Sequence, residues 1–255
     1  MQSTKYTTRF YRDWAGGGPP ARFRVARGAS DLLVLADRPL RFAAQRALDE
    51  ARRQIETRIA ADPGFVDALA PREARAEDGP VVRSMLAAGA AWEVGPMAAV
   101  AGAVAEAVAS RLAARGGEVI VENGGDVFAR LEGRLRLALY AGEASPFRDG
   151  IGIRVDAAGG VAVCTSSASV GHSLSLGRAD AVTAVARSGA VADAAATAIA
   201  NRVRGPRDVE RALAEDGARR GLLGLVVCCG DRLGARGALE LFDRRTGESD
   251  ETKRD

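Results

Sequence analysis

Asp193 and Thr197 lie four residues apart in an Ala-rich segment, and they are the first candidates for chemistry. In a helix, side chains at this spacing lie on one face with Cβ atoms about 5–6 Å apart. A carboxylate and a hydroxyl so placed can both reach one Mg²⁺ ion, which also takes waters and phosphate oxygens. A polar stripe on a surface helix has the same pattern, so the spacing alone leaves both interpretations open.

The second candidate is the turn Asn123-Gly124-Gly125-Asp126, which lies between two apolar runs. Asn-Gly between such runs is typical of a tight β-hairpin, and that alone is one interpretation. Consecutive glycines also let backbone N–H groups approach a ligand without a Cβ in the way. Glu122 and Asp126 would then flank a cofactor-binding turn.

The third candidate is a Ser-rich segment that follows an apolar run and contains the only histidine of the chain. Hydroxyls and turn amides suit phosphate oxygens, and a histidine among them can accept a proton. A Ser-rich loop with an exposed histidine is the alternative, and the absence of a Gly-x-Ser-x-Gly elbow disfavours a Ser–His–Asp hydrolase. The residues concerned are Thr165, Ser166, Ser167, His172 and Ser173.

The composition excludes several classes of protein. The 255 residues include 36 Lys and Arg against 33 Asp and Glu, and the basic residues are scattered, so no nucleic-acid partner is expected. Lys5 and Lys253 are the only lysines, which excludes a phosphate-loop or Schiff-base lysine within the fold. One histidine excludes an HExxH zinc site. Three cysteines without zinc-ligand spacing indicate free thiols and a cytoplasmic protein.

No membrane span or secretory signal is predicted. Residues 1–18 are polar, and the weakly apolar stretch 85–108 is largely Ala and Gly with Glu93 and Glu106 inside it. Ala contributes little to membrane insertion and central charges oppose it, so this stretch predicts buried helix.

The hydrophobic patterns predict an α+β fold with antiparallel sheets and packed helices. A single domain is expected over residues 21–242, with a flexible arm at 1–20 and a mobile charged tail at 243–255. Helices are predicted at 39–60, 81–91, 97–114, 190–203 and 208–218. Strands are predicted at 23–26, 32–36, 181–186, 222–227 and 237–241, as a meander over 119–140, and as a hairpin of 151–155 with 161–164.

Four strings identify a resemblance that covers about residues 20–242. They are Val94-Gly-Pro-Met-Ala-Ala-Val-Ala-Gly102, Val121-Glu-Asn-Gly-Gly-Asp126, the segment from Gly171 to Thr183, and Ala192-Asp-Ala-Ala-Ala-Thr197. In this order they resemble the uncharacterised, UPF-type branch of the ApbE-like superfamily, which is related to FAD:protein FMN transferases. The resemblance implies an α+β fold whose two halves look like a duplicated tunnelling fold.

The resemblance also implies roles for particular residues. In the flavin transferases an Asp, a Thr four residues later and a backbone carbonyl bind Mg²⁺, and Asp193, Thr197 and Ala98 match them. A Gly-Gly-Asp turn borders the flavin, as Gly124 to Asp126 would here, and His172 matches the proposed base. The implied cofactors are Mg²⁺ and FAD or a related flavin or nucleotide, and the implied partner is an acceptor protein.

Two departures from the family pattern keep three functions in view. The transferases carry Ala-Lys-Gly where this chain has Ala98-Ala99-Val100, and Asp-Pro-Arg-Thr-Gly where it has Ser173 to Gly177. The leading hypothesis is a Mg²⁺-dependent enzyme acting on a flavin or related phosphate-bearing cofactor, with FMN transfer from FAD as the nearest reaction. The second is a non-catalytic flavin- or pterin-binding protein in one-carbon cofactor biosynthesis or maintenance. The third is an assembly subunit of a homo-oligomer.

Overall fold

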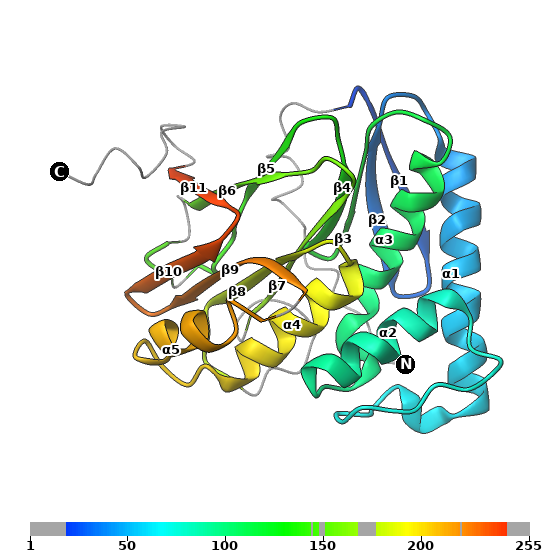
Figure 1. Ribbon diagram of the computed structural model, residues 1–255. Coiled ribbons are helices and arrows are strands. Elements are labelled where there is room, and N and C mark those ends of the chain that lie inside the picture. The colour runs from blue at the N-terminus through cyan, green and yellow to red at the C-terminus, as the bar shows by residue number, and fades with distance from the viewer. Residues whose placement is uncertain (1–18, 144, 148–150, 168–176, 220, 244–255) are drawn as a thin grey trace.

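Eight antiparallel strands form the central sheet of this computed structural model (Figure 1), which describes residues 19–143, 145–147, 151–167, 177–219 and 221–243. Neighbouring strands in the sheet follow the order β1-β2-β3-β4-β7-β8-β9-β10. Their bounds are β1 (Ala21–Arg27), β2 (Ser30–Ala36), β3 (Val119–Asn123), β4 (Asp126–Arg130), β7 (Val161–Ser166), β8 (Ala181–Ala186), β9 (Leu222–Cys229) and β10 (Arg232–Gly237).

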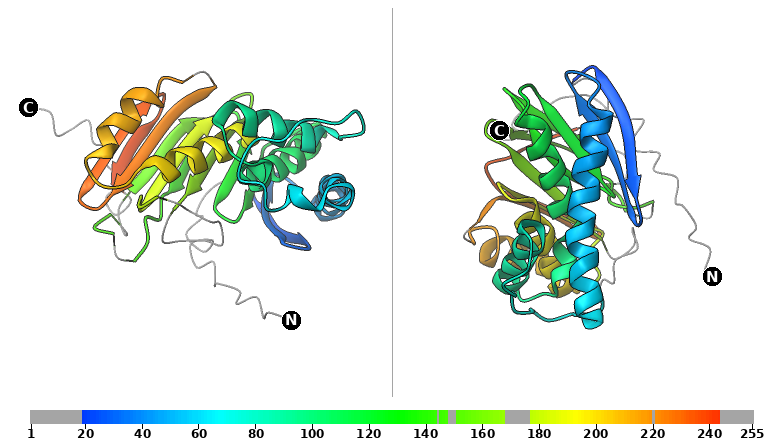
Figure 2. Two further views of the ribbon diagram at one scale, coloured as in Figure 1. Left: turned by 90° about the horizontal axis from the view of Figure 1, so that it is seen from below. Right: turned by 90° about the vertical axis from the view of Figure 1, so that its right-hand side faces the viewer.

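Helices cover one face of this sheet and a smaller sheet covers the other (Figure 2). The smaller sheet has the order β11-β6-β5, with β5 (Arg134–Ala138), β6 (Ile151–Asp156) and β11 (Glu240–Asp243). The helices are α1 (Arg41–Ala61), α2 (Pro80–Trp92), α3 (Val100–Ala113), α4 (Gly189–Arg202) and α5 (Asp208–Glu215), with short 3₁₀ turns η2 (Pro63–Phe65) and η3 (Pro96–Ala99). The α+β prediction is therefore confirmed.

The two halves of the central sheet repeat one order of elements. In the first half, β1 and β2 precede helices α1 to α3, and β3 and β4 follow them. In the second half, β7 and β8 precede α4 and α5, and β9 and β10 follow. Within each half the four strands lie in chain order across the sheet, which is the duplicated arrangement that the resemblance implies.

Burial on both faces explains why the inner strands read as nearly continuous apolar runs. In β8, Val182 and Ala184 pack in the helix-side core, whereas Ala181 and Val185 pack against the smaller sheet. Successive side chains of a strand point to opposite faces, so most positions of an inner strand are apolar. The three cysteines are free, as predicted, and the structure shows that all three are buried.

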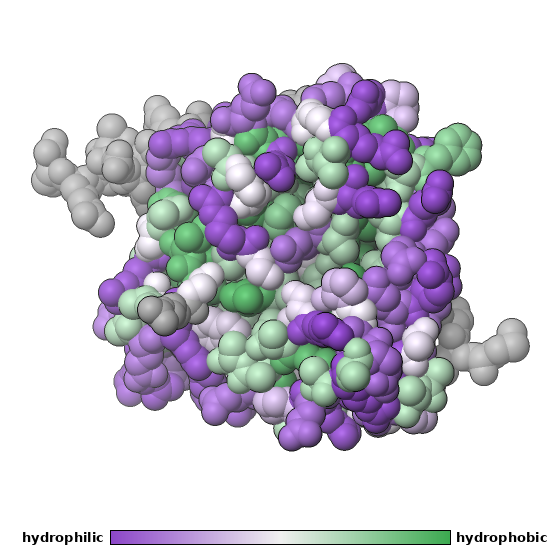
Figure 3. All heavy atoms as spheres, turned by 45° about the vertical axis from the view of Figure 1, so that its right-hand side comes forward, coloured by the Kyte–Doolittle hydropathy of each residue, from purple (hydrophilic) through white to green (hydrophobic). Residues whose placement is uncertain are grey.

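The outer helix α1 shows the opposite pattern. Its buried residues include Leu48 and Ile55, which pack on the sheet, while Arg46, Glu50 and Arg53 face outward. The face shown in Figure 3 accordingly mixes hydrophilic side chains with small hydrophobic patches. This amphipathic stripe is what the 39–60 pattern predicts.

The strand pairings correct two predictions and add a strand. The predicted meander over 119–140 is wrong at its last strand, because β5 leaves β4 and pairs with β6 in the smaller sheet. The predicted hairpin of 151–155 with 161–164 is wrong because β6 and β7 belong to different sheets. Alternating apolar residues suit either sheet, so the pattern carries no information about the partner. Strand β10 was missed because Gly234 and Gly237 interrupt its apolar pattern.

The segment Pro96–Ala113 is long and apolar enough to cross a membrane, judged by length and composition alone. It comprises η3 and α3, and α3 packs against α1, α4, β3 and β4. Half of this segment is buried within the protein, which is typical of a core helix. The finding is weak evidence for a span.

Helices α3 and α4 touch backbone to backbone at Gly102 and Gly189. A Cβ placed on Gly102 would lie 2.2 Å from the carbonyl oxygen of Gly189, and a Cβ on Gly189 would lie 2.2 Å from the oxygen of Gly102. Neither distance is compatible with a side chain. The close approach also explains the alanine content of both helices, because bulkier residues at the contact would separate them.

We expect Gly102→Ala to lower the free energy of unfolding by about 2–4 kcal/mol, because the added methyl group overpacks a backbone contact that cannot yield cheaply. The matched control is Gly133→Ala, since a Cβ on Gly133 meets no protein atom within 4 Å. Urea denaturation of both variants measures the difference. Equal stability of the two variants would show that the helix contact is not a constraint.

Candidate functional site

The carboxylate of Asp193 lies at the N-terminus of α3. Its Oδ2 atom accepts a hydrogen bond of 2.9 Å from the backbone N–H of Gly102, the third residue of that helix. The first N–H groups of a helix have no partner within it, and their partial positive charge favours an anion. Asp193 therefore caps α3 from the neighbouring helix. The alternative of a fully solvated polar stripe on α4 is wrong at this residue.

Glu106 of α3 caps α4 in the same way. Its Oε2 atom accepts a hydrogen bond of 2.7 Å from the N–H of Gly189 and one of 3.0 Å from the hydroxyl of Ser188. Each carboxylate comes four residues after the glycine of its own helix, so the two caps lie on either side of the glycine contact. The capping is reciprocal, because a carboxylate of each helix accepts a hydrogen bond from an N–H group in the first turn of the other helix.

Thr197 lies one turn after Asp193 on the same half-buried arc of α4, which continues to Asn201. The opposite arc, with Ala195 and Ile199, is buried in the helix-side core. Asp193 and Thr197 thus share a face, as their spacing predicts.

The Gly-Gly turn is a tight hairpin joined to the start of α3. Asn123 pairs with Asp126 across the ladder, which leaves Gly124 and Gly125 as a two-residue loop with φ of 70° and 105°. Positive φ at both positions is the requirement of a type I′ turn, so glycine suits both. The Asn123 side-chain amide donates to the carbonyl oxygen of Ala101 at 3.1 Å, and Glu122 accepts from the N–H of Gly125 at 2.8 Å.

A second hydrogen bond joins this turn to the start of the Ser-rich segment. Asp126 Oδ1 accepts from the N–H of Thr165 in β7 at 3.0 Å, and the hydroxyls of Thr165 and Thr183 are 2.8 Å apart. Ser166 ends β7 and Ser167 follows it, both half-buried. His172 and Ser173 lie outside the described residues. The structure therefore brings together the turn, the first residues of the Ser-rich segment and the helix pair.

Burial disfavours ionisation of Asp126, Asp193 and Cys164. Burial, followed by the charge of Asp193, raises the pKa of Asp126 well above its ordinary value, against the hydrogen bond from Thr165. Burial raises the pKa of Asp193 to about 7, although the N–H groups of Gly102 and Ala101 oppose the shift. Burial also raises the pKa of the Cys164 thiol well above its usual range. Within the described ranges, no arginine forms an ion pair with Asp126 or Asp193. A cation at this place would favour the charged carboxylates.

The proposed metal ligands fit a hard, partly hydrated cation better than zinc. The described part of the chain contains no group of three or more His, Cys, Asp or Glu side chains that could hold a metal. Asp193 could supply one carboxylate and Thr197 a hydroxyl, and Ala98, in the half-buried turn η3 that leads into α3, could supply a backbone carbonyl. One carboxylate with neutral oxygens leaves positions for waters and phosphate, which suits Mg²⁺.

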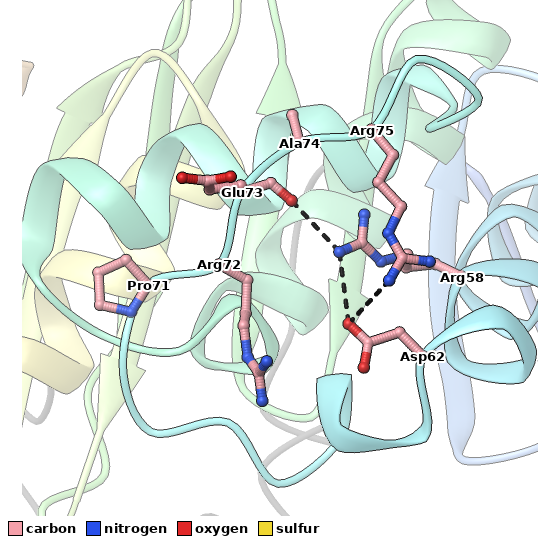
Figure 4. A pocket seen from close by; sticks show the side chains of 7 residues that line it. All are labelled: Arg58, Asp62, Pro71, Arg72, Glu73, Ala74 and Arg75. Atoms are coloured by element: carbon pink, nitrogen blue, oxygen red, sulfur yellow. Dashed lines mark hydrogen bonds and ion pairs between the residues drawn. The ribbon is translucent and has the colours of Figure 1, made fainter.

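A cavity of about 370 Å³ lies at another place, at the end of α1 (Figure 4). No predicted site residue lines it. The buried Arg58 contacts Asp78 at 2.6 Å and Asp62 at 3.5 Å, and Arg75 also lies 3.5 Å from Asp62. Because these charges neutralise one another, the network serves to attach the loop after α1. The lining residues are Arg58, Asp62, Pro71, Arg72, Glu73, Ala74 and Arg75.

Comparison with known proteins identifies relatives over most of the chain. The family model described as AbpE bacteria matches residues 12–228. The UPF0280 protein of Methanocaldococcus jannaschii is 39% identical over 222 residues, which cover 84% of this chain and 89% of the relative. The chain belongs to the UPF0280 family. A second UPF0280 protein, from Methanopyrus kandleri, is 40% identical over 222 residues with the same coverage.

A solved structure shares the fold of this UPF0280 protein. The flavin transferase ApbE from Vibrio cholerae superposes with a TM-score of 0.59 at 14% identity, covering 86% of this chain and 97% of that one. At this identity the similarity concerns the fold. The resemblance to the ApbE-like superfamily, predicted from four short strings, is confirmed at that level.

Sequence reasoning missed Glu106, although a signal for it exists. The strings Gly102-Ala-Val-Ala-Glu106 and Gly189-Ala-Val-Ala-Asp193 repeat each other, with only the length of the acid changed. Ser110 and Thr197 follow each acid by four residues. The repeat marks the two helices that cross, and it places Glu106 as the counterpart of Asp193.

We expect Asp193→Asn to flatten the pH dependence of stability in protein kept free of metal with a chelator. The pKa of Asp193, about 7, lies above the ordinary value of 3.8. Between these values the folded protein holds a proton that the unfolded chain has released, so the free energy of unfolding falls as pH rises. The substitution removes up to about 1.4 kcal/mol per pH unit from that slope.

Urea denaturation at pH 5, 6 and 7 measures the slope. Glu240→Gln is the control, because its ion pairs with arginines lower the pKa of Glu240, which stays ionised throughout this range. A slope in Asp193→Asn equal to that of the unchanged protein would contradict the prediction.

Proposed function

We propose that this protein is a Mg²⁺-dependent enzyme that acts on a flavin or a related phosphate-bearing cofactor. The nearest known reaction is transfer of FMN from FAD to a hydroxyl of an acceptor protein. The proposal extends to this chain what the name of the Vibrio cholerae neighbour, flavin transferase, says of that protein. The cytoplasm is the proposed compartment.

One observation carries the proposal: three segments far apart in the chain meet at the α3–α4 crossing. Asp193 reaches the first turn of α3, Asn123 of the glycine turn reaches the same helix turn, and Asp126 holds the start of the Ser-rich segment through Thr165. A Cβ on Gly125 would meet no atom of the described residues beyond its chain neighbours within 4 Å, so these residues leave the turn backbone open to a ligand.

The residues of this chain would divide the work as follows. Asp193, Thr197 and the Ala98 carbonyl would hold Mg²⁺, which when bound neutralises charge on a pyrophosphate. The residues proposed to line the cofactor are Asn123, Gly124, Gly125, Asp126, Thr165, Ser166, Ser167 and Ser173. The N–H groups of Gly125 and Thr165 already donate to Glu122 and Asp126. The hydroxyls of the set and its remaining backbone N–H groups would hydrogen-bond the isoalloxazine and phosphate oxygens.

The bond changes of the proposed transfer balance. The acceptor hydroxyl forms a new bond to the phosphorus of the FMN moiety, and the bond from that phosphorus to the bridging oxygen breaks. AMP leaves with the bridging oxygen. His172 is proposed to take the proton of the attacking hydroxyl, which general-base catalysis requires.

We expect AMP release from FAD in the presence of Mg²⁺ and its loss when a chelator removes the metal. Asp193→Asn should lower the rate about 100-fold through weaker metal binding, and His172→Ala about 10²–10⁴-fold through loss of the base. Chromatography of the nucleotide products measures the rate. Glu240→Gln, which removes ion pairs with Arg134 and Arg154 in the smaller sheet, should keep full activity.

The same experiment separates the proposal from a non-catalytic binding protein. The altered strings Ala98-Ala99-Val100 and Ser173 to Gly177 favour that second candidate, because they remove a lysine and an acid that the transferases carry. If the protein binds FAD without releasing AMP from it, and His172→Ala leaves the dissociation constant unchanged, the binding function replaces the enzymatic one. Binding of neither Mg²⁺ nor a flavin or pterin would exclude both.

A further inference from the structure

We propose that Glu106 is a positioning residue for Asp193 and Thr197, the two α4 residues of the candidate site. The ligand-binding role of those two residues rests on the proposed function. The position that Glu106 gives to α4 follows from contacts on the described residues alone.

Glu106 holds the start of α4. Ser188 precedes the helix with extended backbone and makes no side-chain cap of its own; its hydroxyl instead donates to Glu106 at 3.0 Å. The N–H of Gly189, the first residue of α4, donates to the same oxygen at 2.7 Å. The first turn of α4 is therefore fixed by a side chain of α3, and Asp193 follows one turn later on the same rigid helix.

The backbone contact allows this position little freedom. A Cβ built on Gly102 lies 2.9 Å from the Cβ of Asp193, and one built on Gly189 lies 3.1 Å from the Cβ of Glu106. With no side chain between the helices, a displacement of the α4 start is passed directly to the Asp193 carboxylate and to its hydrogen bond with Gly102. A displacement of about 1 Å is enough to impair binding or catalysis where side chains must be aligned with a ligand.

The repeat of the two strings adds an independent argument. Glu106 and Asp193 occupy the same place in Gly-Ala-Val-Ala-acid, and each caps the helix that the other belongs to. Ser110, the counterpart of Thr197, is exposed at the far end of α3. The copy in α3 therefore has the capping carboxylate, Glu106, which positions the neighbouring helix. In the copy in α4, the capping carboxylate is followed one turn later by a half-buried hydroxyl, that of Thr197.

The test uses Glu106→Gln in the full chain, because the amide keeps the size and one acceptor oxygen but loses the charge. Amide hydrogen exchange is followed by NMR at Gly189, whose N–H donates to Glu106, and at Gly102, whose N–H donates to Asp193. We expect exchange about tenfold faster at both amides, relative to the slowest amides of the central sheet. Ser188→Ala is a milder change, and it should accelerate exchange at both amides by a smaller factor.

The control is Val108→Ala, a truncation in the buried core of α3 that lowers stability without touching either cap. At denaturant concentrations that equalise the global stability of the two variants, Val108→Ala should leave the relative exchange at both glycine amides unchanged. Faster exchange at Gly189 alone in Glu106→Gln would overturn the proposal, because it would make Glu106 a local cap only.

Calorimetric titration with Mg²⁺ supplies a readout that a purely structural role would not move. We expect Glu106→Gln to weaken Mg²⁺ binding about tenfold and Val108→Ala to leave it unchanged. Mg²⁺ affinity in Glu106→Gln equal to that of the unchanged protein would overturn the proposal while the proposed function stands. If the unchanged protein binds no Mg²⁺, the proposed metal fails, and the exchange at Gly102 alone decides whether Glu106 positions Asp193.

Discussion

The backbone contact between Gly102 and Gly189 is the constraint on which the rest of the site depends. It brings the first turns of α3 and α4 within reach of each other's side chains, so one carboxylate from each helix can cap the other. The glycine turn after β3 attaches to the same helix turn through Asn123. A larger residue at either glycine would separate the helices and break both carboxylate caps at once.

The two buried carboxyl groups of the site, Asp126 and Asp193, are unfavourable for stability when ionised, and this cost bears on function. Asp126 and Asp193 both have raised pKa values because burial removes water from them, and Asp126 is further raised by the charge of Asp193. Hydrogen bonds from helix and strand amides offset part of this cost. Acids held close together in a partly buried place are typical of functional sites, where a ligand supplies what the protein lacks. Here a cation would do so.

Much of the fold follows from local patterns, and the exceptions have one physical cause. Hydrophobic periodicity is visible in the sequence, and it determines the strand pair before α1, the helix boundaries and the buried face of α4. The partners of β5 and β6 depend on long-range packing: both strands cover the outer face of β4, β7 and β8 instead of extending the central sheet. Phe242 of β11 lies over Gly152, a contact between segments far apart that no local pattern encodes.

The features of the candidate site likewise fall into those that follow from local sequence and those that depend on long-range packing. The shared face of Asp193 and Thr197 and the hairpin at Gly124-Gly125 follow from spacing and turn chemistry, and the structure has both. The capping of α3 by Asp193 does not, because it depends on where a second helix crosses. The repeated string marks Glu106 as the counterpart of Asp193, but the role of its carboxylate as a cap follows only from the hydrogen bond with Gly189.

The burial of Ala99 gives a physical reason for one departure from the transferase pattern. This residue takes the place of the transferase lysine in the resemblance, and here its side chain is fully buried in the helix-side core. A lysine at this position would have to bury its ammonium group or displace the start of α3, both of which are costly. With alanine there, no lysine charge lies beside the acids of the described site. Under the proposed function, an anionic cofactor would meet Asp126 and Asp193 without that charge. A divalent cation would then have to neutralise more of the repulsion than where a lysine shares the task.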